Sequence, residues 1–317
     1  MQFAEMQDAL RSVVAIPVTP FSADGQVDLA AYRQLVERLV EAGVRAITPN
    51  GNTGEFYALS PAECRSAVEA TVAAAGEQAL VLAGVGFDIA SAIEMGRSAE
   101  QAGAHAIMIH QPIHPYQSPD GWLAYHQTIA TALPRLGVVP YVRDATISGA
   151  LIARLAERCL NLVGVKYAVA NPLQFAGVVQ AAGVERLAWV CGLAESWAPF
   201  FWVGGARGFT SGLVNVQPAL SLRMLEALRA GDSADALDVW ALIKPFEELR
   251  ARGNNANNVP AVKAALAELG LCGAAVRPPI SELSEPELAE VRAIVRAWQQ
   301  AGVGGAELPN YSKEQNS

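Results

Sequence analysis

The chain has 317 residues, of which 52% are hydrophobic and 17% are charged, and its formal net charge at pH 7 is −8. This composition excludes a disordered chain and favours a globular protein with a sizeable core. The sequence shows no basic stripe for nucleic acid, no apolar run long enough to span a membrane and no signal-peptide pattern over Met1–Val14. We therefore expect a cytoplasmic protein without nucleic-acid or membrane partners.

Strand-like and helix-like segments alternate along most of the chain. Strands are expected near 13–16, 46–48, 79–85, 106–109, 138–142, 162–168, 187–191 and 208–211. Helical patterns follow them at about 28–42, 60–75, 89–102, 119–132, 148–159, 172–182, 195–203 and 218–230. Eight such units predict an α/β fold of the (β/α)8 type, a TIM barrel. A doubly wound open sheet is the alternative, although no GxGxxG motif opens a helix.

The alternation stops after Ala230, and three helical patterns follow at about 233–250, 259–269 and 285–300. These are too short for an independent domain. The predicted organisation is therefore a barrel over 1–230, a helical extension packed on it over 231–301, and a flexible tail over 302–317.

Lys166 lies inside the apolar, β-branched run 162–168. Burial disfavours an ammonium group, so a lysine there has a lowered pKa and a more available neutral amine. A neutral buried amine is what an enzyme needs to form a Schiff base with a ketone. The alternative is a lysine at the end of a strand that extends its amine to solvent.

Other polar residues fall where the expected strands end, which is where TIM barrels carry their active sites. The segment Gly51–Glu55 can expose backbone N–H groups to a carboxylate, and Thr53 adds a hydroxyl. Tyr141 and Arg143 end the fifth strand, as a candidate proton shuttle and a candidate carboxylate ligand. Ser211 and Asn215 follow the eighth strand. Each pattern alone is also compatible with an ordinary turn, a core tyrosine or a helix start.

Histidines and cysteines offer a second kind of chemistry. His110, His114 and Asp120 would bind a metal ion if they converged, which would indicate a metal-dependent lyase, but their spacing matches no established zinc pattern. The four cysteines form no CxxC pair and are expected to be reduced, with Cys191 a small buried hydrophobe.

These clusters, in this order, resemble the dihydrodipicolinate synthase / N-acetylneuraminate lyase family of class I aldolases over about Val13–Trp298. The matching segments are Pro17–Phe21, Gly51–Glu55, Tyr141, Val163–Lys166, Ser211–Asn215 and Val276–Pro279. The resemblance implies a TIM barrel with C-terminal helices, no metal or other cofactor, and a homo-oligomer, either a tetramer or a dimer. It also implies that Lys166 forms a covalent imine with a 2-oxo acid.

The remaining roles follow from that resemblance. Tyr141 and Thr53 would move protons beside Lys166, and backbone N–H groups of the 51–53 segment would hold the substrate carboxylate. The substrate-binding residues would then be Gly51, Asn52, Arg143, Ser211 and Asn215.

Within the family the chain is most similar to 5-dehydro-4-deoxyglucarate dehydratases, which carry Tyr-Asn-Arg-Asp where this chain has Tyr141–Asp144. Val142 therefore replaces an amide, and Tyr167 replaces a common acidic residue. The paired tyrosines of the synthases are replaced by the segment 110–116. We expect dehydration and decarboxylation of a sugar-derived oxo diacid. The alternatives are a dihydrodipicolinate synthase-like or other pyruvate-dependent aldolase, a non-catalytic 2-oxo-acid binding protein, and the metal-dependent lyase.

Overall fold

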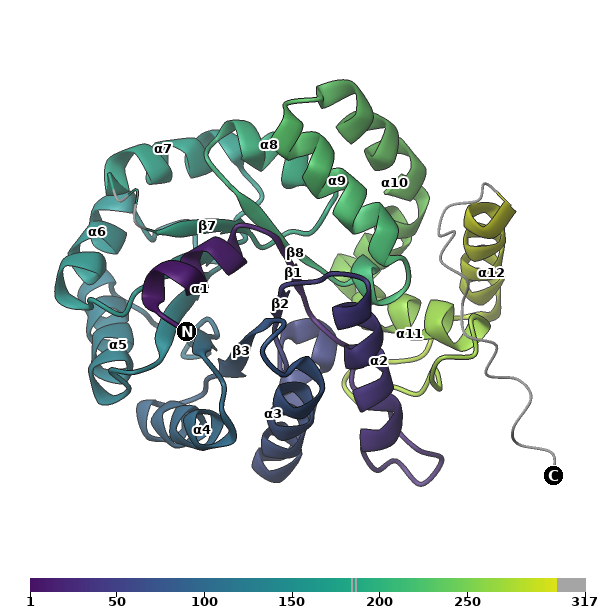
Figure 1. Cartoon of the computed structure of the whole chain (residues 1–317), viewed down its shortest axis with the longest axis horizontal. Helices are drawn as coiled ribbons and strands as arrows, with labels where there is room; N and C mark the ends of the chain where they lie inside the picture. Colours follow the sequence, from purple (N-terminus) through teal and green to yellow (C-terminus); the bar gives the residue numbers. More distant parts are fainter. Residues whose placement is uncertain (184, 186, 301–317) are drawn as a thin grey trace.

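The computed structural model describes residues 1–183, 185 and 187–300, and its centre is a closed barrel of parallel strands in chain order (Figure 1). The strands are β1 (Val13–Ala15), β2 (Ala46–Ile47), β3 (Leu80–Val85), β4 (Ala106–Ile109), β5 (Gly137–Val142), β6 (Gly164–Tyr167), β7 (Ala188–Cys191) and β8 (Gly208–Ser211). β8 pairs with β1, which closes the sheet. The predicted (β/α)8 barrel is confirmed, and the open doubly wound sheet is wrong.

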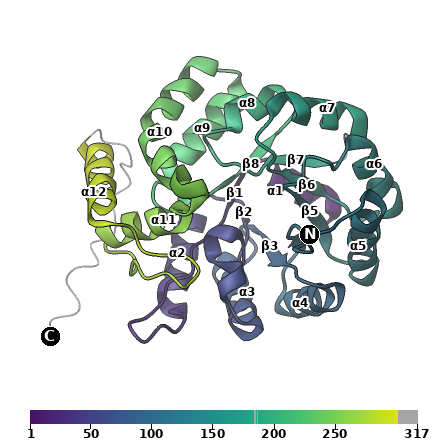
Figure 2. The same ribbon diagram turned by 180° about the vertical axis from the view of Figure 1, so that it is seen from behind.

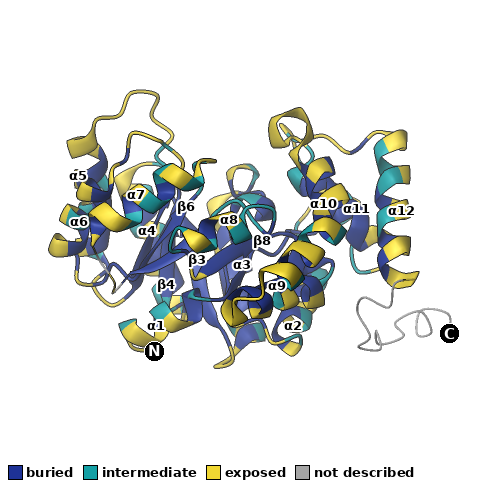
Figure 3. Ribbon diagram, turned by 90° about the horizontal axis from the view of Figure 1, so that it is seen from above, coloured by how far each residue is buried: buried dark blue, intermediate teal, exposed yellow. Residues whose placement is uncertain are grey.

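A ring of helices surrounds the strands, and Figure 3 shows their outer faces exposed while the strands are buried. The ring consists of α2 (Leu29–Glu41), α3 (Pro61–Ala75), α4 (Ile89–Ala102), α5 (Pro119–Ala132), α6 (Gly149–Arg158), α7 (Pro172–Ala182), α8 (Ala198–Val203) and α9 (Pro218–Ala230). The helix expected from residue 195 begins later, at Ala198, because Ala194 takes a left-handed conformation (φ 62°) and Glu195 lies in the turn before the helix.

Local capping chemistry explains several helix starts. The Asp28 side chain accepts from the N–H groups of Ala30 and Ala31, as expected for the N-cap of α2. Ser60 and Glu63 form a reciprocal capping box at the start of α3. These side chains satisfy helical N–H groups that would otherwise lack partners, so they fix where the strand-to-helix loops end.

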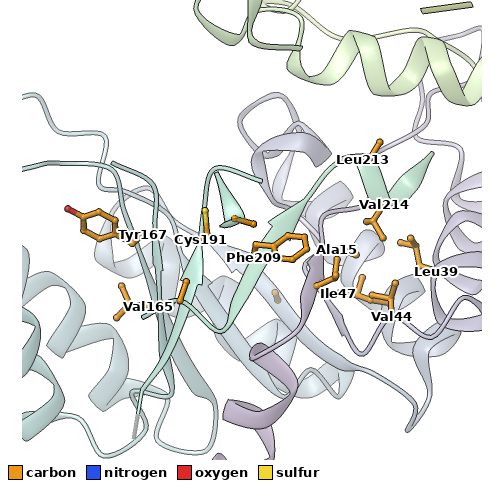
Figure 4. Close-up of a cluster of buried hydrophobic side chains, with 14 of the residues drawn as sticks. Ala15, Leu39, Val44, Ile47, Val165, Tyr167, Cys191, Phe209, Leu213 and Val214 are labelled. Carbon is orange, nitrogen blue, oxygen red and sulfur yellow. The ribbon is translucent and has the colours of Figure 1, made fainter. Parts of the chain in front are cut away.

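Alternation along each strand separates two apolar layers. The outward-facing residues of β6, Val165 and Tyr167, join the layer between strands and helices (Figure 4). Inward-facing side chains such as Val14, Met108 and Val190 fill the barrel. Since successive side chains on a strand point to opposite faces, Lys166 faces the barrel interior.

A helix that the sequence did not suggest closes the amino-terminal end of the barrel. Helix α1 (Phe3–Leu10) packs Met6, Ala9 and Leu10 against the inward-facing strand residues. This plug leaves the carboxyl ends of the strands as the open end of the barrel.

The C-terminal helices lie together beside α2 and α9, on one side of the barrel (Figures 1 and 2). They are α10 (Ser233–Asn255), α11 (Asn258–Glu268) and α12 (Glu285–Gln300), and α10 leaves the helical conformation at 252–254. Helix α11 contacts two short 3-10 turns, η1 (Asn52–Gly54) and η3 (Leu213–Asn215), which follow β2 and β8. A third, η2 (Phe56–Ala58), follows η1 directly. The extension therefore reaches the rim that carries the predicted site.

Within residues 1–183, 185 and 187–300, no helix combines the length and apolarity needed to cross a membrane. The predicted flexible tail at 302–317 lies outside the described residues.

Candidate active site

Lys166 and Tyr141 meet inside the barrel. They are register partners on the adjacent strands β6 and β5, so their side chains emerge side by side on the same face. The Lys166 Nζ atom lies 4.0 Å from the centroid of the Tyr141 ring. Both residues are buried, with 3% of Lys166 and 6% of Tyr141 exposed. The structure thus brings together the candidate amine, Lys166, and the candidate phenol, Tyr141, that we selected from the sequence.

The surroundings of Lys166 favour its neutral amine. Burial, together with the nearby positive charge of Arg143, lowers its pKa from 10.5 to about 7. Among the described residues, no carboxylate pairs with the Lys166 Nζ atom. The other buried lysine, Lys263, is 2.5 Å from Glu55 Oε1. Of these two buried lysines, Lys166 is thus the one whose amine has no carboxylate partner within the described part of the chain.

The loop after β2 supplies backbone donors beside this pair. In η1 the Gly54 N–H bonds to the Gly51 carbonyl, which leaves the preceding N–H groups of Asn52 and Thr53 without an acceptor among the described residues. A Cβ atom at Gly51 would lie 2.5 Å from Cγ2 of Ile16, the residue after β1, so any larger residue there would force the Ile16 side chain or the loop to shift. Thr53 is buried in the same turn.

Two further side chains act on Tyr141. Burial raises the pKa of the Tyr141 hydroxyl, so the phenol is held protonated at neutral pH. The charge of Arg143 and a hydrogen bond with the Asn52 side chain oppose that rise in pKa.

Arg143 is exposed at the end of β5, and its backbone N–H donates to Gln111 Oε1 over 3.3 Å. No side chain or carbonyl among the described residues holds its guanidinium, which can therefore meet a ligand at the barrel mouth.

Ser211 and Asn215 are directed elsewhere. Ser211 pairs in register with Ala15 on the outer face of the barrel, and its hydroxyl bonds to Glu195 and to the Val214 N–H. The Asn215 amide donates to the carbonyls of Ile16 and Gly212, and its oxygen accepts from the Val18 N–H. The structure therefore does not bring these two side chains to Lys166, and their substrate-binding role stays a prediction.

The structure also shows a buried carboxyl group that sequence reasoning missed. Glu195 is fully buried after β7 and accepts hydrogen bonds from Ser211 and Ser221. Burial, together with the neighbouring charge of Glu247, raises its pKa to about 7. An acidic residue in the loop that follows a barrel strand was the available signal.

The histidines proposed as metal ligands have separate partners. His110 Nε2 bonds to the Asn50 carbonyl over 2.8 Å, His114 Nδ1 lies 2.8 Å from the Tyr116 carbonyl, and Asp120 pairs with Arg154. Within the described residues, no group of three His, Cys, Asp or Glu side chains could hold a metal ion. That no metal is needed remains a prediction.

His110 stacks on Phe56, with ring centroids 4.2 Å apart, and burial lowers its pKa to about 3. It is therefore a neutral part of the wall beside Tyr141. Cys191 is fully buried, and burial raises its pKa to about 12, so it is an inert core residue as predicted.

The fold class is a closed (β/α)8 barrel, and near the carboxyl ends of its strands it carries a buried amine that no carboxylate pairs with among the described residues. Barrel enzymes carry their active sites at this end of the strands. The model of the dihydrodipicolinate synthetase family matches residues 9–298. The chain belongs to this family and is a lyase.

Individual relatives agree with that placement. A probable 5-dehydro-4-deoxyglucarate dehydratase from Rhodococcus opacus (strain B4) is 34% identical over 290 residues, covering 90% of this chain and 94% of the relative. The crystal structure of a dihydrodipicolinate synthase from Bacillus clausii matches with a TM-score of 0.90 and 44% identity, covering 93% of this chain and 99% of that one.

A prophage protein of the same family from E. coli K12, solved in complex with pyruvate, matches with a TM-score of 0.82 and 25% identity over 92% of this chain and 99% of that one. Similarity to these proteins extends over the barrel and the C-terminal helices together.

Proposed function

We propose that this lyase forms a Schiff base between Lys166 and a 2-oxo acid. The observation that carries the proposal is the Lys166 amine, unpaired among the described residues and 4.0 Å from the centroid of the Tyr141 ring. A neutral amine buried among apolar side chains is a strong nucleophile, and its pKa near 7 keeps much of it neutral at physiological pH.

The first half of the reaction follows from this geometry. The Lys166 nitrogen adds to the ketone carbon, and the carbonyl oxygen leaves as water after Tyr141 has delivered the protons. The N–H groups of Asn52 and Thr53 hold the adjacent carboxylate, and Thr53 assists proton transfer. The protonated imine withdraws electrons, so the neighbouring C3 carbon releases a proton and an enamine forms.

For the second half we propose dehydration and decarboxylation. The enamine expels a hydroxyl group from C4 as water, which restores a conjugated imine. Loss of the far carboxylate as CO2 sends its bonding electrons through the conjugated chain to the imine nitrogen. The dienamine that results takes up a proton on carbon to become an imine again, and water then releases the product from Lys166. Arg143, exposed at the mouth, is suited to bind the far carboxylate bidentately before it leaves.

The relative named as a probable 5-dehydro-4-deoxyglucarate dehydratase supports this choice of substrate, a sugar-derived oxo diacid. The B. clausii structure, at higher identity, is named a dihydrodipicolinate synthase, and this favours a second candidate. In that case the enamine attacks an aldehyde and a carbon–carbon bond forms. Pyruvate bound to the E. coli protein fits either reaction, since both begin with a 2-oxo acid.

A substrate panel separates the two. The purified chain is incubated with sugar-derived oxo diacids while CO2 release is followed, and with pyruvate plus a series of aldehydes while pyruvate consumption is followed. CO2 release from a diacid supports the dehydratase, and pyruvate consumption that depends on an aldehyde supports the synthase or aldolase. Imine formation without either turnover would show a 2-oxo-acid binding protein instead.

We also expect a homo-oligomer, tetramer or dimer, which sedimentation would detect.

A further inference from the structure

A buried ion pair joins the C-terminal extension to the loop after β2. Lys263 of α11 and Glu55, which ends η1, are 208 positions apart, yet their side chains are both 0% exposed and Nζ lies 2.5 Å from Oε1. The same amine donates to the Ala275 carbonyl over 2.7 Å and lies 4.1 Å from the centroid of the Phe21 ring. The Lys263 amine is therefore held by an ion pair and by a hydrogen bond to a carbonyl, neither of which Lys166 has among the described residues.

The extension also holds the second oxygen of the same carboxylate. The backbone N–H of Arg277 donates to Glu55 Oε2 over 2.9 Å. The Arg277 guanidinium continues along the loop, where it donates to the Ala58 carbonyl and pairs with Glu63. Both oxygens of Glu55 are thus held by residues that lie outside the eight strand–helix units.

The backbone at Glu55 needs such support. Its φ angle is 60°, in the left-handed region that residues with a side chain rarely adopt. The loop passes through this residue as η1 turns into η2. Glu55 also donates its N–H to the Asn52 carbonyl, which closes the turn whose first N–H groups belong to Asn52 and Thr53. The conformation of Glu55 therefore sets the direction of those N–H groups.

We propose that Lys263 is a positioning residue: by pairing with Glu55 it aims the Asn52 and Thr53 N–H groups at the substrate carboxylate. This inference rests on the proposed function, because it takes the 51–53 loop as the carboxylate site. Lys263 touches neither the substrate nor Lys166, so its loss weakens substrate binding more than it slows the chemistry.

The test uses the full chain with two single variants and a double one. Lys263→Met removes the positively charged partner, which lies in the extension. Glu55→Gln removes the negatively charged partner, which lies in the loop, and keeps an oxygen that can accept from the Arg277 N–H. The double variant, Glu55→Gln with Lys263→Met, leaves neither charge buried without its partner. Arg252→Gln is the matched control, since it breaks an ion pair with Glu290 on the exposed surface of the same extension.

Three quantities are measured for each variant: the pyruvate concentration that gives half-maximal borohydride labelling of Lys166, and the KM and kcat for the substrate that the panel identifies. We expect the half-labelling concentration and KM to rise about 10- to 100-fold in the three pair variants, the range for a misplaced binding group, with kcat within about threefold. The acid limb of the pH profile stays in place, because the surroundings of Lys166 are unchanged. Arg252→Gln behaves as the parent chain.

Unchanged KM and labelling in a folded pair variant, with folding checked by circular dichroism, overturns the positioning role. If Lys263→Met does not fold, the near-isosteric Glu55→Gln and the double variant decide by the same criterion. A parent chain that is never labelled at Lys166 contradicts the proposed function instead, so the two failures are distinguishable.

Discussion

The Nζ atom of Lys166 lies over the face of the Tyr141 ring, 4.0 Å from its centroid, because the two residues are register partners on neighbouring parallel strands. Neither side chain is anchored by a loop, so the rigid barrel wall fixes their relative position. The amine and the phenol are both buried, and burial moves their pKa values in opposite directions. The lysine becomes easier to deprotonate and the tyrosine harder, which leaves a neutral nucleophile beside a neutral acid.

Replacing Lys166 by methionine tests the nucleophile without disturbing the fold. We expect kcat to fall at least about a thousandfold, as when other enzymes lose a covalent nucleophile. The melting temperature should stay the same or rise, because an apolar chain replaces a buried amine. Lys244→Met, at an exposed lysine of α10, is the control and should keep full activity. A Lys166→Met chain with more than about a tenth of the parent activity would rule out the covalent mechanism.

Tyr141→Phe removes one hydroxyl from the barrel interior and keeps the ring under Lys166. The rate should drop about 10²- to 10⁴-fold, the usual contribution of a positioned proton-transfer group. Single-turnover kinetics with pyruvate would show whether imine formation is the slowed step. Tyr116→Phe, at a residue that is 84% exposed, should have no effect. An unimpaired Tyr141→Phe variant would assign proton transfer to another group.

The lowered pKa of Lys166 predicts an acid limb in the rate profile. Since the neutral amine reacts, kcat/KM should rise with pH up to about 7, the pKa of this amine, and then level off. The positive charge of Arg143 contributes to that low pKa, so Arg143→Gln should raise the pKa and move the limb to higher pH, by roughly half a unit to one unit.

For this comparison the rate of imine formation with pyruvate, trapped by borohydride, is followed in place of turnover, because pyruvate has no far carboxylate for Arg143 to bind. Arg154→Gln, which breaks a surface pair with Asp120, is the control for a general loss of positive charge. A limb that moves to lower pH in Arg143→Gln, or not at all, would show that this charge does not act on the reacting amine.

The ion pair between Glu63 and Arg277 predicts how stability depends on pH. Hydrogen bonds with Arg277 lower the pKa of Glu63 from 4.5 to about 2. A carboxyl group with a lowered pKa stabilises the fold above its unfolded value, and this contribution is lost as pH falls from 4.5 towards 2. With both side chains about a quarter exposed, we expect Glu63→Gln to cost about 1–2 kcal/mol of unfolding free energy at pH 7.

Urea titrations of the parent chain and of Glu63→Gln, at pH 7 and near pH 3, would test this expectation. The difference between their free energies of unfolding should be smaller near pH 3 than at pH 7. An equal difference at the two pH values would mean that the stabilisation does not depend on the Glu63 charge.

Metal removal separates the Schiff-base mechanism from the metal-dependent one. Dialysis against a chelator should leave kcat unchanged, because the protonated imine on Lys166 accepts the electrons released at C3. In the metal-dependent mechanism a metal ion would stabilise that negative charge instead. Activity that disappears on dialysis and returns with one divalent ion would favour the metal-dependent lyase.

Much of the barrel could be predicted from the sequence, because strand-like and helix-like periodicity is local and capping residues such as Ser60 mark where helices begin. Helix α1 was not predicted because it is short. Its apolar residues are buried only by contact with the end of the barrel that it closes, and the local sequence does not reveal that contact. The position of Lys166 in an apolar strand indicated burial, but its contact with Tyr141 depends on strand register, which the sequence does not specify.

Two features of the site could not be predicted from the sequence: the direction of a side chain at the end of a strand, and the pairing of residues far apart in the chain. Ser211 ends a barrel strand, as an active-site residue would, yet strand alternation turns it outward to Glu195, and one position decides between the two faces. The pairing of Glu55 with Lys263 joins two segments that have no local relation in the sequence. Such contacts arise only after the extension has packed on the barrel.

Borohydride trapping tests the central claim most directly. The chain is incubated with pyruvate, reduced with borohydride, digested, and its peptides are weighed by mass spectrometry. The account predicts the mass increment of one reduced pyruvyl group on the peptide that contains Lys166, and no increment in Lys166→Met. Absence of the increment with pyruvate and with longer 2-oxo acids, or its appearance on another lysine, would contradict it.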